Sequence, residues 1–195
     1  MKVFCAALVA IVAVALAGCL PVTTKTPVGT TVGLAADPAL IGTWKGHNGS
    51  EKDPQDGFFH FIKMKDGSIS AVTIVAADKP GDEWTIYRVR CAALGSNHFL
   101  NAVMTFDNGE AVNGPLKDAT FPVLYAIKGK TLTLYLVDED KAKAAITAGK
   151  IKGTVEPGMS GDVTITAEAK DLDAFMTKPE AKDLFKLLIV LKKVE

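Results

Sequence analysis

Residues 57–77 read GFFHFIKMKDGSISAVTIVAA and hold two strand-like runs on either side of a tight turn. In the runs 57–65 and 68–77, apolar and polar side chains largely alternate, which is typical of a β-strand with one buried face. The turn between them is Lys65-Asp66-Gly67-Ser68, and an Asp-Gly pair favours the turn of a β-hairpin. The stretch therefore predicts two antiparallel strands that are neighbours in a sheet.

The same pattern continues on both sides of this hairpin. Turn sequences recur at Asp107-Asn108-Gly109 and Lys128-Gly129-Lys130. Short strands joined by tight turns predict a mainly β domain, either an antiparallel β-barrel or a sandwich. The further expected strands are 40–47, 83–94, 98–106, 120–128, 131–138, 151–155, 162–169 and 187–194.

One or two short helices are expected near the C-terminus. Residues 138–148 carry acidic side chains in their first turn and are followed by Gly149, a pattern that indicates a helix and its end. Residues 171–185 predict a helix pair broken near Pro179. The expected apolar contacts of this pair are Phe175, Leu184 and Phe185.

The segment Leu40-Ile41-Gly42-Thr43-Trp44 opens the domain and resembles the Gly-x-Trp signature on the first strand of lipocalins and related small barrels. The resemblance implies that Trp44 packs across the closed end of a barrel, beneath a basic residue of the last strand. The stretch 187–194 would be that strand, since its apolar residues suit a strand buried on both faces. It offers Lys192 and Lys193 in place of an arginine. The two predicted helices are not part of the lipocalin pattern.

The N-terminus has the features of an export signal. Lys2 is followed by an uncharged apolar run over residues 3–17, which is shorter than the roughly 20 residues of a membrane-spanning helix. The run ends in Leu16-Ala17-Gly18-Cys19, which resembles the lipobox of bacterial lipoproteins. This resemblance implies cleavage after Gly18 and attachment of a diacylglyceryl group to the Cys19 thiol.

These features predict three parts of the chain: a lipoprotein signal peptide (1–18), a lipidated N-terminus with a flexible tether (19–36), and a single β-rich domain (37–195). The predicted tether is rich in threonine, proline and glycine and has no amphipathic period. We expect the protein in the cell envelope, anchored through lipid on Cys19. Leu20 stands where an aspartate commonly signals inner-membrane retention, which favours the outer membrane facing the periplasm.

Charge and cysteine content narrow the function classes. The chain has 22 Lys and Arg against 22 Asp and Glu residues, and this balance argues against a nucleic-acid partner. The cysteines are Cys5, Cys19 and Cys91. Since Cys5 lies in the leader and Cys19 would carry lipid, Cys91 has no partner for a disulfide within the mature chain.

No catalytic or metal-binding motif is evident. His47, His60 and His98 are far apart and lack the spacing of a zinc site. Cys91 has no base near it in sequence, and a lone strand cysteine is usually a small buried hydrophobe. Arg88 and Arg90 share a strand face that would either bind an anion or be solvated. We therefore predict neither an enzyme nor a cofactor.

Two functions fit these observations. The first is a lipid-anchored β domain that binds a small apolar ligand or lipid. His60 shares one face with Phe58, Ile62 and Met64, where it would be a polar group in an apolar pocket or a hydrogen-bonded or exposed histidine. The second is a structural or assembly lipoprotein whose surface binds another envelope protein. The ligand-binding candidates, depending on sheet register, are Phe58, His60, Trp84, Tyr87 and Tyr125.

Overall fold

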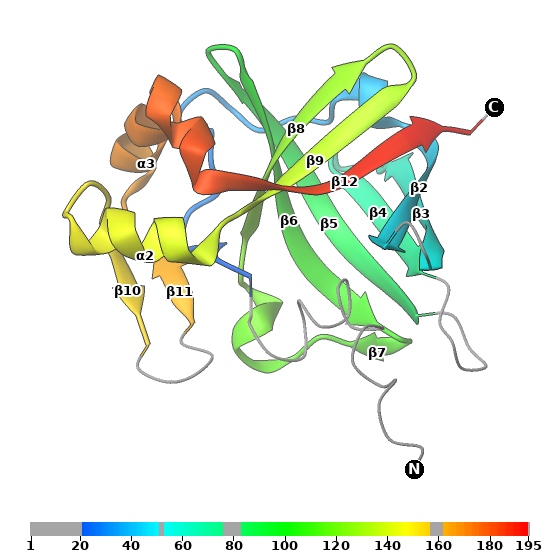
Figure 1. Cartoon of the computed structure of the whole chain (residues 1–195), viewed down its shortest axis with the longest axis horizontal. Helices are drawn as coiled ribbons and strands as arrows, with labels where there is room; N and C mark the ends of the chain where they lie inside the picture. Colours follow the sequence, from blue (N-terminus) through cyan, green and yellow to red (C-terminus); the bar gives the residue numbers. More distant parts are fainter. Residues whose placement is uncertain (1–20, 51–52, 76–82, 157–161, 195) are drawn as a thin grey trace.

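The computed structural model describes residues 21–50, 53–75, 83–156 and 162–194 (Figure 1). The predicted lipobox, residues 16–19, and with it Cys19, lies outside the described residues. In the described part, eight long strands form a closed antiparallel barrel in which each strand pairs with the next along the chain, and the last pairs with the first. These strands are β2 (Gly42–Ser50), β3 (Asp53–Lys63), β4 (Ile69–Val75), β5 (Glu83–Leu94), β6 (Asn97–Asp107), β8 (Phe121–Lys128), β9 (Thr131–Val137) and β12 (Phe185–Lys193).

The predicted mainly β fold is confirmed, and the structure selects the barrel over the sandwich. The hairpin at residues 57–77 becomes β3 and β4, which pair from Gly57 opposite Val75 to Lys63 opposite Ile69. The final stretch is the closing strand, as expected. Its outer face is solvated rather than buried, because Leu187 is 58% exposed and Val190 is 44% exposed.

Trp44 lies at one end of the barrel, which we call the closed end. Its ring is fully buried and its Nε1–H donates to the carbonyl of Leu40, 2.6 Å away. Leu40 ends a short 3-10 helix, η1 (Pro38–Leu40), that leads into β2. The Lys193 ammonium lies 5.1 Å from the centre of the Trp44 ring, a cation–π contact. The basic residue implied by the lipocalin resemblance is therefore Lys193.

A second, smaller unit is inserted between β9 and β12 (Figure 1). Its helix α2 begins after Asp138, whose carboxylate accepts a hydrogen bond from the Lys141 N–H at 3.2 Å. The predicted helix pair is present as α3 and η3, with Phe175, Leu184 and Phe185 buried. The unit consists of α2 (Glu139–Thr147), β10 (Gly153–Val155), β11 (Val163–Ile165), α3 (Ala169–Met176) and η3 (Pro179–Leu184).

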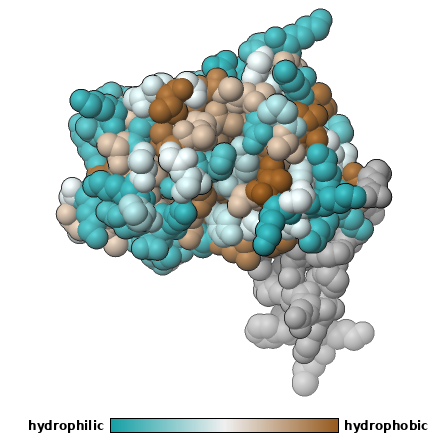
Figure 2. Space-filling model, turned by 90° about the horizontal axis from the view of Figure 1, so that it is seen from above, coloured by the Kyte–Doolittle hydropathy of each residue, from teal (hydrophilic) through white to brown (hydrophobic). Residues whose placement is uncertain are grey.

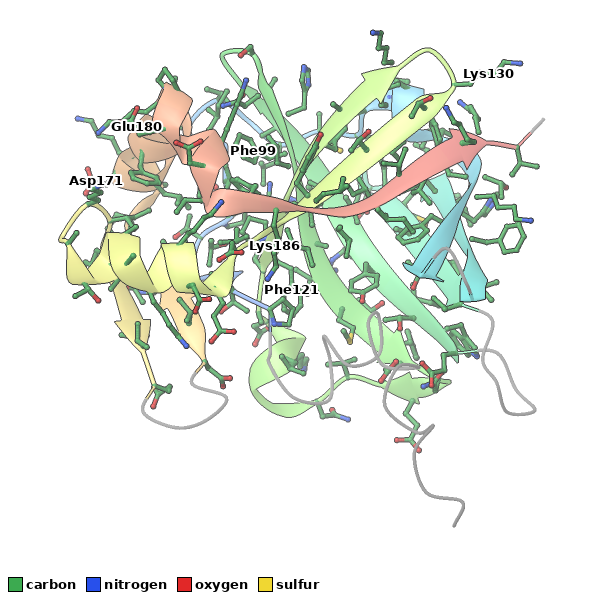
Figure 3. All side chains as sticks on the ribbon, viewed as in Figure 1. Phe99, Phe121, Lys130, Asp171, Glu180 and Lys186 are labelled. Atoms are coloured by element: carbon green, nitrogen blue, oxygen red, sulfur yellow. The ribbon has the colours of Figure 1, made fainter. Side chains whose placement is uncertain are left out.

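The inserted unit packs against the outside of the barrel around its own hydrophobic core. Phe99 of β6 and Phe185 of β12 contribute to this core, with ring centres 5.9 Å apart. Figure 3 shows Phe99 on the side of the barrel that faces the helices. The remaining elements, the two-residue strand β7 (Glu110–Ala111) and the 3-10 helix η2 (Gly114–Lys117), lie between β6 and β8.

The prediction of a flexible tether is wrong for residues 21–36. Val22 and Val28 are buried in the core of the inserted unit, and the short strand β1 (Thr23–Thr24) pairs in parallel with β11. Further along, Ala35 and Cys91 exchange two backbone hydrogen bonds. The polar composition of this segment does not indicate its fold. Its backbone hydrogen bonds and the apolar contacts of its two valines are made with distant parts of the chain.

Asp173 of α3 fixes the middle of this segment. Its side chain is only 4% exposed, and its two carboxylate oxygens accept three hydrogen bonds. The donors are the Gly29 N–H at 2.6 Å, the Thr31 N–H at 2.9 Å and the Thr31 hydroxyl at 2.6 Å. A buried carboxylate that accepts several such bonds joins the two segments strongly.

Replacing Asp173 with alanine should release this segment. We expect the substitution to lower the free energy of unfolding by about 3 kcal/mol, because buried donors lose a charged acceptor. Trypsin should then cleave after Lys25, a site whose backbone N–H is bonded to Ile165 in the wild type. Denaturant unfolding and limited proteolysis measure the two effects. Asp171→Ala, at an exposed position of the same helix, is the control and should leave Lys25 protected. Equal protection in both variants would contradict the role of Asp173.

Candidate functional site

An apolar cavity of about 130 Å³ lies inside the barrel. Side chains from β3, β4, β5, β6, β8, β9 and β12 contribute to its wall, so it exists only in the closed barrel. The lining residues are Pro21, Phe59, Phe61, Ala71, Thr73, Tyr87, Val89, Leu100, Ala102, Met104, Phe121, Val123, Leu134, Leu136 and Leu188.

Among the described residues, none that lines the cavity has a charged side chain. Its polar side chains are those of Thr73 and Tyr87. The Thr73 hydroxyl is 3.4 Å from the carbonyl of Thr85, to which it donates. Burial, aided by the negative charge of Asp107, raises the pKa of Tyr87 to about 12, so its hydroxyl is neutral at physiological pH. Such a wall accepts an apolar group and offers no partner for a charge.

Several of the lining residues lie at the end of the barrel opposite Trp44, which we call the mouth. The lining residues at this end belong to the first or last residues of their strands, such as Phe121 at the start of β8 and Leu136 near the end of β9. Figure 3 labels Phe121 beside η2, away from the turn between β8 and β9 that holds Lys130. Toward the closed end, the fully buried side chains of Trp44, Leu132 and Leu191 fill the interior.

Of the five predicted ligand-binding residues, Tyr87 lines this cavity and Tyr125 is buried nearer the closed end. The expectation that the other three face into the barrel is wrong. Phe58, His60 and Trp84 lie on the outer face, where Phe58 is 37% exposed and His60 is also exposed. The alternative interpretation of His60 as a hydrogen-bonded, exposed histidine agrees with its contact to the Thr43 hydroxyl, 2.7 Å from its Nδ1.

Phe59 and Phe61 line the cavity instead, and neither was among the predicted ligand-binding residues. In the run Phe58-Phe59-His60-Phe61, aromatic residues occupy both odd and even positions, which point to opposite faces of a strand. Alternation alone therefore does not indicate which of them point inward. The Gly-x-Trp segment that opens the domain indicates which face of β3 points inward. Trp44 points inward, and Phe59 is paired directly opposite it on β3. Residues opposite each other in a sheet share a face, so Phe59 points inward too.

The outward-facing residues form two rows across neighbouring strands. In one row Phe58, Ile74 and Trp84 lie opposite one another in register. In the next row His60, Val72, Ile86 and Phe106 do the same. We call these seven residues the outer apolar rows. The ammonium of Lys45 lies 5.5 Å from the Phe58 ring centre at their edge. The space-filling view in Figure 2, seen from above relative to Figure 1, shows apolar side chains scattered among hydrophilic ones.

Arg88 and Arg90 lie on the outer face of β5 and are exposed. Cys91 points inward at the closed end, close to Tyr125 and Asp37. The Tyr125 hydroxyl donates to the Asp37 carboxylate at 2.6 Å. Burial raises the pKa of the Cys91 thiol to about 11, with a smaller contribution from the negative charge of Asp37. A thiol with this pKa is a poor nucleophile at neutral pH.

Cys91 should therefore react slowly with thiol reagents. At pH 8, a thiol of pKa about 11 has about 100-fold less thiolate than an ordinary thiol, so alkylation by iodoacetamide should be slower by at least that factor. The folded pKa lies above the unfolded value, so this thiol also lowers stability as the pH rises from about 9 to 11. The rate can be measured on a chain that begins at residue 19 and carries Cys19→Ser, so that Cys91 is its only thiol, before and after unfolding in urea. Alkylation of the folded chain at the unfolded rate would show that Cys91 is accessible.

Comparison with protein-family models, with curated proteins and with solved structures finds no match. Among the described residues, no group of three or more His, Cys, Asp and Glu side chains could hold a metal ion. Within that same part of the chain, no helix has the length and apolar character to cross a membrane.

Proposed function

We propose that this protein is an envelope lipoprotein whose barrel binds a small apolar ligand or a lipid acyl chain in its cavity. The observation that carries this proposal is the cavity wall, whose described residues carry no charge and line an apolar space inside the barrel. Each methylene group that moves from water into such a site contributes about 0.8 kcal/mol to binding. The barrel fold is compatible with this function, as it is in the lipocalins that the Gly42-Thr43-Trp44 opening resembles.

The size of the cavity limits the ligand. A cavity of about 130 Å³ is close to an engineered apolar cavity of about 150 Å³ that binds benzene. A narrow group, such as a short stretch of one acyl chain or a single small ring, is therefore the class of ligand that fits. The absence of charge on the wall requires any polar head group to remain at the mouth.

The second candidate function is attachment to another envelope protein. The outer apolar rows support it, because Ile74 and Phe106 are 37% and 42% exposed on a face that the described residues do not cover. Large exposed apolar patches often mark interaction sites. The two functions use opposite faces of the same strands, so substitutions on either face separate them.

Filling the cavity should abolish ligand binding. Ala102 lines the cavity and is buried, and Ala102→Phe adds a ring to the space that the ligand needs. We expect the affinity for the fluorescent fatty acid cis-parinaric acid to fall by at least tenfold, about 1.4 kcal/mol. The measurement is fluorescence titration of a chain that begins at residue 19 and carries Cys19→Ser. Ala102→Leu provides a smaller change in case the ring destabilises the barrel.

The matched control is Ala126→Phe, which adds the same ring at an exposed position on β8. This variant should bind the fatty acid as the parent does. Equal binding by the Ala102 and Ala126 variants would contradict the cavity as the site. If substitutions in the outer apolar rows then removed binding, the fatty acid would bind on the outer face of the barrel.

Anchoring through Cys19 can be tested separately. Bacteria grown with an alkyne-bearing fatty acid should label the wild-type protein, and Cys19→Ser should remove the label because the acceptor thiol is gone. Cys5→Ser is the control, since Cys5 belongs to the predicted leader and its loss should leave the label in place. Label that persists in the Cys19→Ser variant would overturn the lipidation of Cys19.

A further inference from the structure

We propose that an acyl chain carried by Cys19 occupies the barrel cavity of the same molecule. This inference rests on the proposed function, since it needs both an apolar-ligand cavity and lipid on Cys19. It adds the identity and the source of the ligand. The protein would shelter part of its own lipid anchor rather than a lipid collected from elsewhere.

The first observation is the position of Pro21. This residue, two positions after Cys19, is part of the cavity wall together with Phe121 and Leu188. The chain is tied down close by, because the Thr24 N–H donates to the carbonyl of Thr120 at 2.8 Å, next to Phe121. The described chain therefore begins at the mouth of the cavity.

The second observation is that this position is fixed by contacts outside the cavity. Val22 is buried in the core of the inserted unit. Thr23 and Thr24 pair with Thr164 and Ile165 of β11, and the Lys25 N–H donates to the carbonyl of Ile165 at 2.9 Å. Pro21 therefore lies at the mouth whether or not the cavity is filled.

The third observation is the reach of the anchor. Consecutive Cα atoms are about 3.8 Å apart, so the Cα atom of Cys19 lies within about 8 Å of the Cα atom of Pro21. An acyl chain that spans one leaflet of a membrane is about 15 Å long, half of the roughly 30 Å hydrocarbon core. A chain attached to Cys19 is therefore long enough to enter the cavity from the mouth.

The attachment also favours the chain of the same molecule over other lipids. A ligand joined by a short link has an effective concentration of about millimolar, well above that of a free fatty acid in the periplasm. Moving an acyl chain from the bilayer into an apolar cavity exchanges one apolar environment for another, so the step does not require exposure of the chain to water. The cavity wall is uncharged and accepts the chain, while the glycerol group and the remaining acyl chains stay outside.

Photocrosslinking in living bacteria tests the inference on the full chain. The bacteria are grown with a fatty acid that carries both a diazirine and an alkyne, irradiated, and the protein is digested and analysed by mass spectrometry. The alkyne reports lipid on Cys19. We expect crosslinks between the N-terminal lipopeptide and peptides that hold cavity residues such as Met104 and Val123. Ala102→Phe should remove these crosslinks, and Ala126→Phe should keep them.

The outcomes separate this inference from the proposed function. If cavity peptides carry only free fatty acid or phospholipid, the own-chain inference is wrong and the proposed ligand cavity stands. When no cavity peptide is crosslinked although Cys19 is labelled, both fail. Crosslinks from the lipopeptide to the outer apolar rows alone would also overturn the inference, because the anchor would then lie outside the barrel.

Discussion

The pairing of β12 with β2 is the constraint on which the rest of the structure depends. It joins the last strand to the first and leaves the sheet without long open edges. Gly46 makes the close approach feasible, since a Cβ atom there would lie 2.6 Å from the Leu191 side chain and 2.7 Å from the carbonyl oxygen of Val190. Trp44, buried beneath Lys193, fills the interior beside this junction. Without closure there would be no enclosed cavity.

Closure also provides the outer surface on which the N-terminal segment lies. Asn101 on β6 points outward, and its side chain both accepts from the Val28 N–H at 2.7 Å and donates to the Val28 carbonyl at 2.8 Å. The segment therefore follows the barrel from the mouth, at Pro21, to the closed end, at Asp37. The segment therefore starts at the mouth and reaches the closed end, where β2 begins, because it runs along the barrel wall.

The limits of the sequence follow from what local patterns encode. Strand positions could be predicted because alternation and turn residues are local, and the expected range 83–94 agrees with β5. The inward face of β3 could not be predicted in this way, because Phe58 and Phe59 are both aromatic. Only the pairing of Phe59 with Trp44 shows which of the two points inward. The ordered structure of residues 21–36 could not be predicted for a similar reason. Their partners, such as Asp173 and Ile165, are more than a hundred residues away in the chain.

Burial controls the ionisation of two side chains in the barrel. Tyr87 and Cys91 both have raised pKa values because burial disfavours their charged forms, so both remain neutral donors at physiological pH. A nucleophile or general base would need the opposite shift, or a partner placed to accept its proton. The same low polarity that keeps these groups neutral is what an acyl chain needs. Burial among apolar side chains weakens Cys91 as a nucleophile, and the same apolar character lets the cavity wall accept an apolar group.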